Sequence, residues 1–304
     1  MTTYTRLLSP EQASLLRGIL ESEGYELSEK PYSLYHASKA KLSVTVYEKG
    51  PKIVVQGKDA TEFVQFLLEP RVLGQAEIGY EEQQNPSMFE PHFGIDESGK
   101  GDFFGPLVIA GAYTDREIAR QFLSSGIQDS KAIKSDARIR ALADTIRSTP
   151  GVSYEVICVS PKRYNEMYAS FANLNKLLAW GHAKVIECMH ARRPDCPRAL
   201  SDQFANPRQL SAALAKRDIP ILLEQRTKAE SDIAVAAASI LARACFIDWL
   251  RDTGSLLGTK LPRGASHEVR VVATRLLEQR GEEYLGEVGK IHFKGIFESG
   301  KSID

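Results

Sequence analysis

The pattern of apolar positions predicts two regions of different architecture, and the first is a small mixture of helix and strand. A helix is expected from Pro10 to about Glu23, because Ser9 and Pro10 form a helix start and leucine and isoleucine then recur with helical spacing. Three strand-like segments follow, at 32–38, 41–48 and 52–57. A short helix should then begin at Asp59 or Thr61 and turn three apolar side chains inward, namely Phe63, Phe66 and Leu67.

From residue 92 onward, strand and helix patterns alternate. Strands are predicted at 92–96, 106–113, 152–160, 199–204 and 219–225. Helices are predicted at 135–148, 173–191, 231–250 and 266–281. This alternation is typical of an α/β domain with a mixed central sheet flanked by helices.

A polar segment separates the two regions. Residues 71–92 carry two glycines and two prolines and show no sustained period. We therefore divide the chain into a small α+β domain (1–72), a linker (73–91) and a larger α/β domain (92–304).

Composition narrows the class of protein. Apolar residues make up 43% of the chain and charged residues 26%, which is ordinary for a globular protein and too hydrophobic for a disordered one. We expect no membrane contact, because no stretch approaches the roughly 20 uninterrupted apolar residues that cross a bilayer. The start of the chain does not resemble a signal peptide, so we expect a cytoplasmic location. The cysteines form no CxxC pair and no common zinc spacing, so we interpret them as reduced thiols.

Charge is balanced overall but not locally. The chain has 39 basic and 39 acidic residues, so it lacks the excess of positive charge that often marks nucleic-acid binders. The segment from Lys30 to Lys58 is locally basic, with lysines at 30, 39, 41, 49, 52 and 58. These lysines could bind nucleic acid or simply favour solubility, and the small domain could also serve folding or dimerisation.

Several acids stand where an α/β domain places its active site. Asp96 and Glu97 are predicted to close the strand at 92–96, and Asp202 lies within the strand at 199–204. Glu230 and Asp232 stand at the start of the helix at 231–250. Carboxylates brought together repel one another unless a cation neutralises them, and oxygen ligands favour Mg²⁺ or Mn²⁺ over Zn²⁺. Two such ions about 4 Å apart would support phosphodiester hydrolysis. The alternative is that these acids only cap strand ends and helix starts.

The segment around Asp96 sets a geometric condition. Neighbouring residues on an ideal strand point to opposite faces, so Asp96 and Glu97 can share a site only if the strand ends or bulges there. The glycines in Gly99-Lys100-Gly101 allow close backbone approach, so this loop could offer N–H groups and a lysine to a phosphate. It lacks the glycine spacing of a nucleotide P-loop.

Gly94–Asp102, continuing as FFGPLVIAG, resembles the first motif of the type-two ribonucleases H. Lys100 stands where ribonuclease HII usually carries arginine, which points to ribonuclease HIII. Three later motifs agree in order: Asp129-Ser130-Lys131, Leu200–Phe204, and Lys228–Ser231 running into AVAAASILAR. The resemblance covers residues 93 to about 295.

This resemblance implies a ribonuclease H-like fold and endonucleolytic cleavage of the RNA strand of RNA/DNA hybrids, leaving 3′-hydroxyl and 5′-phosphate ends. It implies Mg²⁺ or Mn²⁺ as cofactor, with two ions in the reacting complex, bound by Asp96, Glu97, Asp202 and Glu230. The chain is one residue short after Glu230 compared with many relatives, so a shifted alignment would place Asp232 there instead. By the same resemblance, Gly99, Lys100 and Gly101 would sense ribose 2′-hydroxyls, and Ser130 and Lys131 would contact phosphates.

The first 72 residues resemble the TATA-binding-protein-like N-terminal domain of ribonuclease HIII, which helps to hold the substrate; Lys39, Lys41 and Lys52 are the candidate contacts. Two alternatives remain open: ribonuclease HII-like cleavage at single ribonucleotides in duplex DNA, and a non-catalytic nucleic-acid-binding protein. No obligate protein partner is evident, so a monomer is expected.

Four histidines lack catalytic spacing and are expected to be structural, namely His92, His182, His267 and His292. Asp102 has no expected role beyond a hydrogen bond within its loop.

Overall fold

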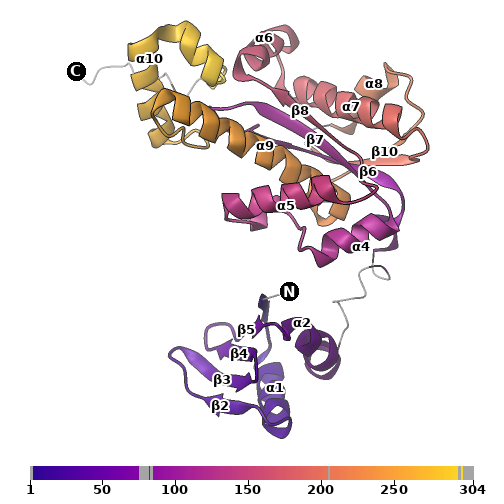
Figure 1. Ribbon diagram of the computed structural model, residues 1–304, viewed down its shortest axis with the longest axis vertical. Coiled ribbons are helices and arrows are strands. Elements are labelled where there is room, and N and C mark those ends of the chain that lie inside the picture. Colours follow the sequence, from indigo (N-terminus) through magenta and orange to yellow (C-terminus); the bar gives the residue numbers. More distant parts are fainter. Residues whose placement is uncertain (1–2, 75–81, 83–84, 205, 294–295, 297–304) are drawn as a thin grey trace. The chain divides into compact units, whose positions relative to one another are not determined.

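The chain divides into two compact units, Met1–Ser87 and Met88–Asp304, each with its own hydrophobic core (Figure 1). The computed structural model describes residues 3–74, 82, 85–204, 206–293 and 296. Much of the predicted linker at 73–91 lies outside the described residues. Near its end, Met88 and Phe89 in η2 (Pro86–Phe89) are buried in the core of the second unit.

The first unit is built on a five-stranded antiparallel sheet in the order β1-β5-β4-β3-β2. Its strands are β1 (Thr3–Leu7), β2 (Glu26–Ser28), β3 (Ser33–Lys39), β4 (Leu42–Tyr47) and β5 (Lys52–Gly57). The three central strands and helix α1 (Pro10–Ser22) confirm the predictions, and Ser9 and Gln12 form a capping box at the helix start. β1 and β2 were not predicted, because these edge strands are short and mostly exposed and so lack apolar alternation.

The last segment of this unit departs from the predicted inward-facing helix. α2 (Ala60–Phe63) continues into the π-helix η1 (Val64–Leu73), whose wider turns bury Val64, Leu68 and Val72 against the core. Phe66 is 75% exposed, so the prediction that it faces inward is wrong.

The second unit contains a mixed sheet in the order β10-β9-β6-β7-β8, as the alternating pattern predicted. Its strands are β6 (His92–Ser98), β7 (Leu107–Thr114), β8 (Tyr154–Val159), β9 (Arg198–Asp202) and β10 (Leu222–Arg226). β6, β9 and β10 run parallel to one another, whereas β7 and β8 pair antiparallel. β6 is therefore the strand at which parallel and antiparallel pairing meet.

Helices cover both faces of this sheet (Figure 1). α9 (Ile233–Leu257) packs on one face with α4 (Arg116–Ser124) and α5 (Asp136–Ser148) against it. α7 (Leu174–Arg192) covers the other face, with α6 (Pro161–Phe171) and α8 (Pro207–Ala215) beside it, and α10 (His267–Val288) packs on α6. α4, α6 and α8, of 9, 11 and 9 residues, were not predicted from the sequence.

Two glycines show which strand residues face which helix. A Cβ on Gly94 would lie 2.1 Å from the carbonyl carbon of Ala234 in α9, and one on Gly111 would lie 2.3 Å from Met189 Sδ in α7. Gly111 pairs directly with Ile95, the neighbour of Gly94. Even-numbered residues of β6 therefore face α9, and odd-numbered ones face α7.

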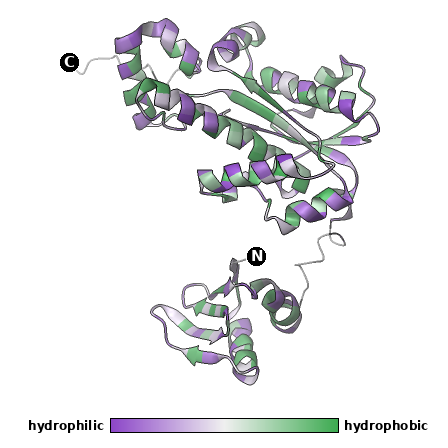
Figure 2. Cartoon of the chain, in the orientation of Figure 1, coloured by the Kyte–Doolittle hydropathy of each residue, from purple (hydrophilic) through white to green (hydrophobic). Residues whose placement is uncertain are grey.

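α9 is the central helix of the core. Within the part of the chain that the structure describes, it is the one helix long and apolar enough to cross a bilayer, but 78% of its most apolar window is buried inside the protein. In Figure 2, β7 and much of α9 carry hydrophobic residues, as expected for elements that pack together.

The four cysteines are free, as predicted.

Candidate active site

β6 stays regular through the acidic pair. It pairs with β7 residue by residue as far as Ser98, so the expectation that the strand ends or bulges at Asp96 and Glu97 is wrong. On its other side, β6 pairs with β9 only as far as Ile95 opposite Ser201. The two parallel strands separate just beyond that pair, where β9 ends at Asp202.

This separation lets neighbouring residues serve one site. Asp96 faces α9 and Glu97 faces α7, yet both line a pocket of about 430 Å³ together with Asp202. The pocket lies beyond the carboxyl ends of two parallel strands, where open α/β sheets bind their ligands.

Asp96 is buried among like charges. Burial first, and then the carboxylates of Glu97 and Asp202, raise the pKa of its carboxyl to about 7. A hydrogen bond from the Ser239 hydroxyl of α9 opposes this rise without cancelling it. A cation close to Asp96 would therefore strongly stabilise the ionised form of its carboxyl group.

Glu97 has the partners that Asp96 lacks. Its Oε2 lies 3.0 Å from His182 Nε2 on α7, and its Oε1 accepts a hydrogen bond of 2.8 Å from Lys100 Nζ. Burial alone would raise the pKa of Glu97, but the hydrogen bond and charge of His182, and then Lys100, lower it to about 2. His182 is itself oriented by the Ser201 hydroxyl, 3.0 Å from its Nδ1.

Glu230 lies beside the pocket on the short turn η4 (Ala229–Ser231). The backbone N–H of Ala229 donates to Asp202 Oδ1 at 3.2 Å, which links this turn to the end of β9. Lys131 Nζ, which lines the pocket, lies 3.5 Å from Glu230 Oε1. The carboxylates of Glu230, Asp96 and Asp129 raise the pKa of Lys131 despite the opposing effect of burial.

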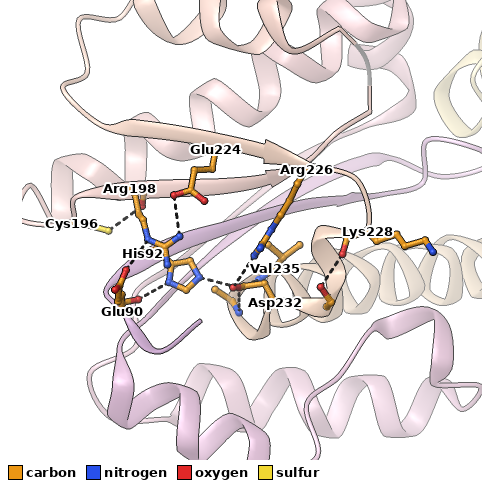
Figure 3. A network of polar contacts seen from close by, with 11 residues as sticks. Glu90, His92, Cys196, Arg198, Glu224, Arg226, Lys228, Asp232 and Val235 are labelled. Carbon is orange, nitrogen blue, oxygen red and sulfur yellow. Dashed lines mark hydrogen bonds and ion pairs between the residues drawn. The ribbon is translucent and has the colours of Figure 1, made fainter. Parts of the chain in front are cut away.

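Asp232 serves a different purpose, although it is only two residues away. It is the N-cap of α9, where its Oδ1 accepts from the N–H groups of Ala234 and Val235 at 2.9 and 3.4 Å. The same oxygen lies 2.9 Å from His92 Nε2 (Figure 3). Burial would raise the pKa of Asp232, but these partners, His92 first, lower it. Its Oδ1 is thus already engaged within the core, and its buried Oδ2 lies 3.5 Å from Arg226 without a hydrogen bond. These contacts favour Glu230 over Asp232 as the fourth acid.

The loop after β6 forms one wall of the pocket. Gly99 has a φ of +86°, and a Cβ there would lie 2.2 Å from the carbonyl oxygen of Pro106, so the loop requires glycine at this position. Gly101 has open space where a Cβ would stand, so its backbone is accessible. Asp102 Oδ1 accepts from the Gly264 N–H at 2.6 Å, and the buried Lys290 ammonium donates to the Asp102 carbonyl at 2.9 Å. The side chain of Asp102 therefore bonds to a distant segment and not within its own loop, and it ties the loop to the C-terminal part of the unit.

The donor set suits a hard divalent cation. The three carboxylates that line the pocket are oxygen donors, and the crowding at Asp96 calls for positive charge. Although these carboxylates line one pocket, no three acidic, histidine or cysteine side chains among the residues that the structure describes stand close enough to hold a metal ion as they are. Lys100 and Lys131 instead supply the positive charge, at Glu97 and Glu230.

Known proteins decide the family. The model of the ribonuclease HII family matches residues 93–296 of this chain. The chain belongs to the ribonuclease HII family. Ribonuclease HIII of Chlamydia felis is 42% identical to this chain, and the match covers 96% of this chain and 96% of that protein. Ribonuclease HIII of Protochlamydia amoebophila is 41% identical, and the match covers 96% of this chain and 95% of that protein.

Solved ribonuclease structures share the fold. The crystal structure of Bst-RNase HIII in complex with Mn²⁺ has a TM-score of 0.66 at 26% identity and covers 97% of both chains. Ribonuclease HII from Archaeoglobus fulgidus, solved with PCNA, has a TM-score of 0.57 at 27% identity and covers 70% of this chain. The ribonuclease H-like fold and the resemblance to ribonuclease HIII are thus confirmed, and the chain is an endonuclease of the ribonuclease H type. The alternative of a non-catalytic binding protein does not hold.

Among the predicted substrate contacts of this ribonuclease, three besides Lys131 have other partners in the structure. Lys100 pairs with Glu97, and Lys39 donates to the Glu23 carbonyl at the end of α1 at 2.6 Å. The Ser130 hydroxyl is buried and lies 2.8 Å from that of Ser239. Lys41 and Lys52 are exposed.

Sequence reasoning missed the residues that hold the acids in place. His182 contacts Glu97, Ser239 contacts Asp96, and His92 contacts Asp232. A histidine on an apolar helix face signals a buried polar group, but its partner lies across the sheet and depends on the strand order. The small residues of α9 predicted close packing on the sheet, but not which of its serines reaches a carboxylate.

Proposed function

We propose that this ribonuclease hydrolyses the RNA strand of RNA/DNA hybrids with the help of divalent metal ions. The observation that carries the proposal is the convergence of Asp96, Glu97 and Asp202, from two separating parallel strands, on one pocket walled by the Gly99–Gly101 loop. Bst-RNase HIII, a relative of the same fold, has been solved with Mn²⁺.

The acids differ in the parts they can take. Two bound ions, Mg²⁺ or Mn²⁺, would polarise the phosphodiester, lower the pKa of the attacking water and stabilise the leaving oxygen, so that 3′-hydroxyl and 5′-phosphate ends result. Asp96 is repelled by the carboxylates on both sides of it, which makes it the candidate to bridge the ions. Glu97 and Asp202 would complete one set of ligands, and Glu230 on η4 the other.

The two lysines at the acids are suited to exchange partners. Lys100 and Lys131 neutralise Glu97 and Glu230 in the structure, and both side chains are partly exposed. When cations take over that role, the ammonium groups become available for the phosphates of the substrate. The accessible backbone at Gly101 lies on the same wall, where it can approach a ribose 2′-hydroxyl, the group that distinguishes RNA from DNA.

The first unit would hold the hybrid outside the active site. Lys52 lies next to the buried Ile53 on β5 and therefore on the sheet face opposite the helices, whereas Lys39 is bound at the end of α1. We expect Lys52→Gln to weaken hybrid binding and to lower its salt dependence by about one counterion. Hybrid binding measured at several salt concentrations checks this, and an unchanged slope would remove Lys52 from the interface.

Two observations favour runs of ribonucleotides over single ones as the substrate. The ribonuclease HIII relatives match the whole chain, including the first unit, whereas the archaeal ribonuclease HII covers only 70% of it. Cleavage should be compared on a hybrid with an RNA strand, a DNA duplex with one embedded ribonucleotide, and an all-DNA duplex, each with Mg²⁺, Mn²⁺ or EDTA. We expect metal-dependent cutting of the first alone. Efficient cutting of the second would instead assign ribonuclease HII-like specificity, and no cutting of any would overturn the proposal.

A further inference from the structure

Three contacts in a row join β6 to the start of α9. They involve alternate residues of the strand, each facing the helix. His92 Nε2 lies 2.9 Å from Asp232 Oδ1, and Gly94 packs directly on the backbone of Ala234 and Val235. Asp96 then accepts a hydrogen bond from Ser239. The first contact of the row therefore fixes the end of α9 that adjoins η4, while the last lies in the active site.

The His92 ring has an oxygen atom beside each of its nitrogens. Its Nδ1 lies 2.7 Å from the Glu90 carbonyl oxygen, which can only accept. Its Nε2 lies 2.9 Å from Asp232 Oδ1, which also accepts from two backbone N–H groups (Figure 3). Arg226 lies 3.5 Å from the second Asp232 oxygen. The side chains of His92 and Asp232 are both fully buried, so their contact joins β6 to the start of α9 inside the core.

Glu230 depends on this pair for its position. The turn η4 that carries it is tied to β9 at one end, through the Ala229 N–H and Asp202. At its other end, the Asp232 N–H donates to the Ala229 carbonyl at 2.8 Å, and the Asp232 side chain is held by His92. The side chain of Glu230 itself lies no closer than 3.5 Å to Lys131, its partner in the structure, so it contributes little to fixing the turn.

We propose that His92 is a positioning residue, which fixes Asp232 from β6 and thereby holds the η4 turn so that Glu230 points to the site formed by Asp96 and Asp202. The idea rests on the proposed function, because it concerns the acid assigned there to the second set of metal ligands.

Two isosteric amides separate positioning from simple structural support. In His92→Gln the amide nitrogen stands near the place of Nε2 and can still donate to Asp232. In His92→Asn it stands near the place of Nδ1, so it can donate to the Glu90 carbonyl but leaves Asp232 without its partner. Both variants put a neutral amide at the same buried position, so their folding burden is similar.

We expect His92→Asn to lower kcat for hybrid cleavage at saturating Mn²⁺ at least tenfold, with KM for the hybrid changed less than twofold. His92→Gln should restore kcat to within about threefold of wild type. The matched control is His190→Asn on α7, because the buried Nδ1 of His190 has no hydrogen-bond partner among the described residues. It should keep wild-type kcat.

A second measurement is independent of cleavage. Hydrogen–deuterium exchange of the metal-free protein should show faster exchange in His92→Asn over residues 227–236, where Asp232 protects the Ala234 and Val235 N–H groups, and wild-type exchange elsewhere in the second unit. Equal losses of kcat in the Asn and Gln variants would overturn the proposal, as would wild-type exchange over 227–236 in His92→Asn. If the wild-type protein does not cleave the hybrid, the proposed function fails, while the exchange experiment still decides whether His92 holds the turn.

Discussion

Asp96 and Asp232 are both carboxylates at the contact between β6 and α9, and they differ in almost every other respect. Asp96 has one hydrogen-bonding serine and two neighbouring carboxylates, and its pKa is raised to about 7. Asp232 has two backbone N–H groups, a histidine and a nearby arginine, and its pKa is lowered.

The difference shows how to separate a ligand-binding acid from a structural one. A carboxylate that already accepts from several donors has less need of a cation than one that stands beside like charges. Sequence position alone does not make this distinction, because Glu230 and Asp232 are two residues apart in the same motif.

The largest loss of activity should come from replacing Asp96, the acid without strong partners. Asp96→Asn removes the carboxylate proposed to bridge the metal ions, so kcat should fall by about a thousandfold, because several kcal/mol of transition-state stabilisation are at stake. Hybrid binding, measured by fluorescence anisotropy without turnover, should survive. Turnover within tenfold of wild type would exclude Asp96 from the site.

Asp232 should instead matter most for stability. Asp232→Ala removes the N-cap of the 25-residue α9 and leaves the buried His92 without its hydrogen-bond partner. Losing a helix N-cap costs about 0.5–2 kcal/mol of the free energy of unfolding, and leaving a buried polar group without a partner costs about 1–3 kcal/mol. Denaturant unfolding at pH 7 measures this, and a loss below about 1 kcal/mol would show that the pair contributes little.

The raised pKa of Asp96 makes stability depend on pH in a known direction. Below about pH 4 its carboxyl is protonated in both the folded and the unfolded state, so it costs nothing. As the pH rises to about 7, the unfolded chain releases the proton while the folded protein retains it, so the metal-free protein loses stability across this range. The cost is roughly 1.4 kcal/mol for each unit of pKa difference.

Asp96→Asn lacks this carboxyl group, so without metal it should unfold at a higher temperature than wild type at pH 8 but not at pH 4. Thermal unfolding of both proteins in EDTA at the two pH values provides the measurement. An equal difference at both would show that the carboxyl is not strained by its surroundings.

The fold was predictable where the apolar pattern is strong. The central strands of both units and the long helices α7 and α9 follow directly from their periodicity. The edge strands β1 and β2 were missed because their residues alternate between solvent and partial burial. Phe66 was misplaced because a π-helix shifts the buried face, and helical periodicity alone does not reveal such a change.

For the site, the motifs pointed to three acids that line one pocket in the structure, but not to how these acids meet. Asp96 and Glu97 were expected to need a broken strand, whereas they meet because β9 separates from β6 after Ile95. That separation depends on which strands are neighbours, and the same holds for His182 and His92, whose partners come from elements far away in the sequence. Such cross-sheet contacts are set by the tertiary structure, not by local pattern.

The most direct test of the assignment compares two neighbouring substitutions in one assay. Glu230→Gln and Asp232→Asn each remove one negative charge, and the asparagine oxygen can still cap α9 and accept a hydrogen bond from His92. The kcat for hybrid cleavage should be measured for both at saturating Mn²⁺, alongside wild type. We predict a loss of at least a hundredfold for Glu230→Gln and a kcat within about fivefold of wild type for Asp232→Asn. The reverse order would contradict the account, because it would make Asp232 the fourth metal-binding acid.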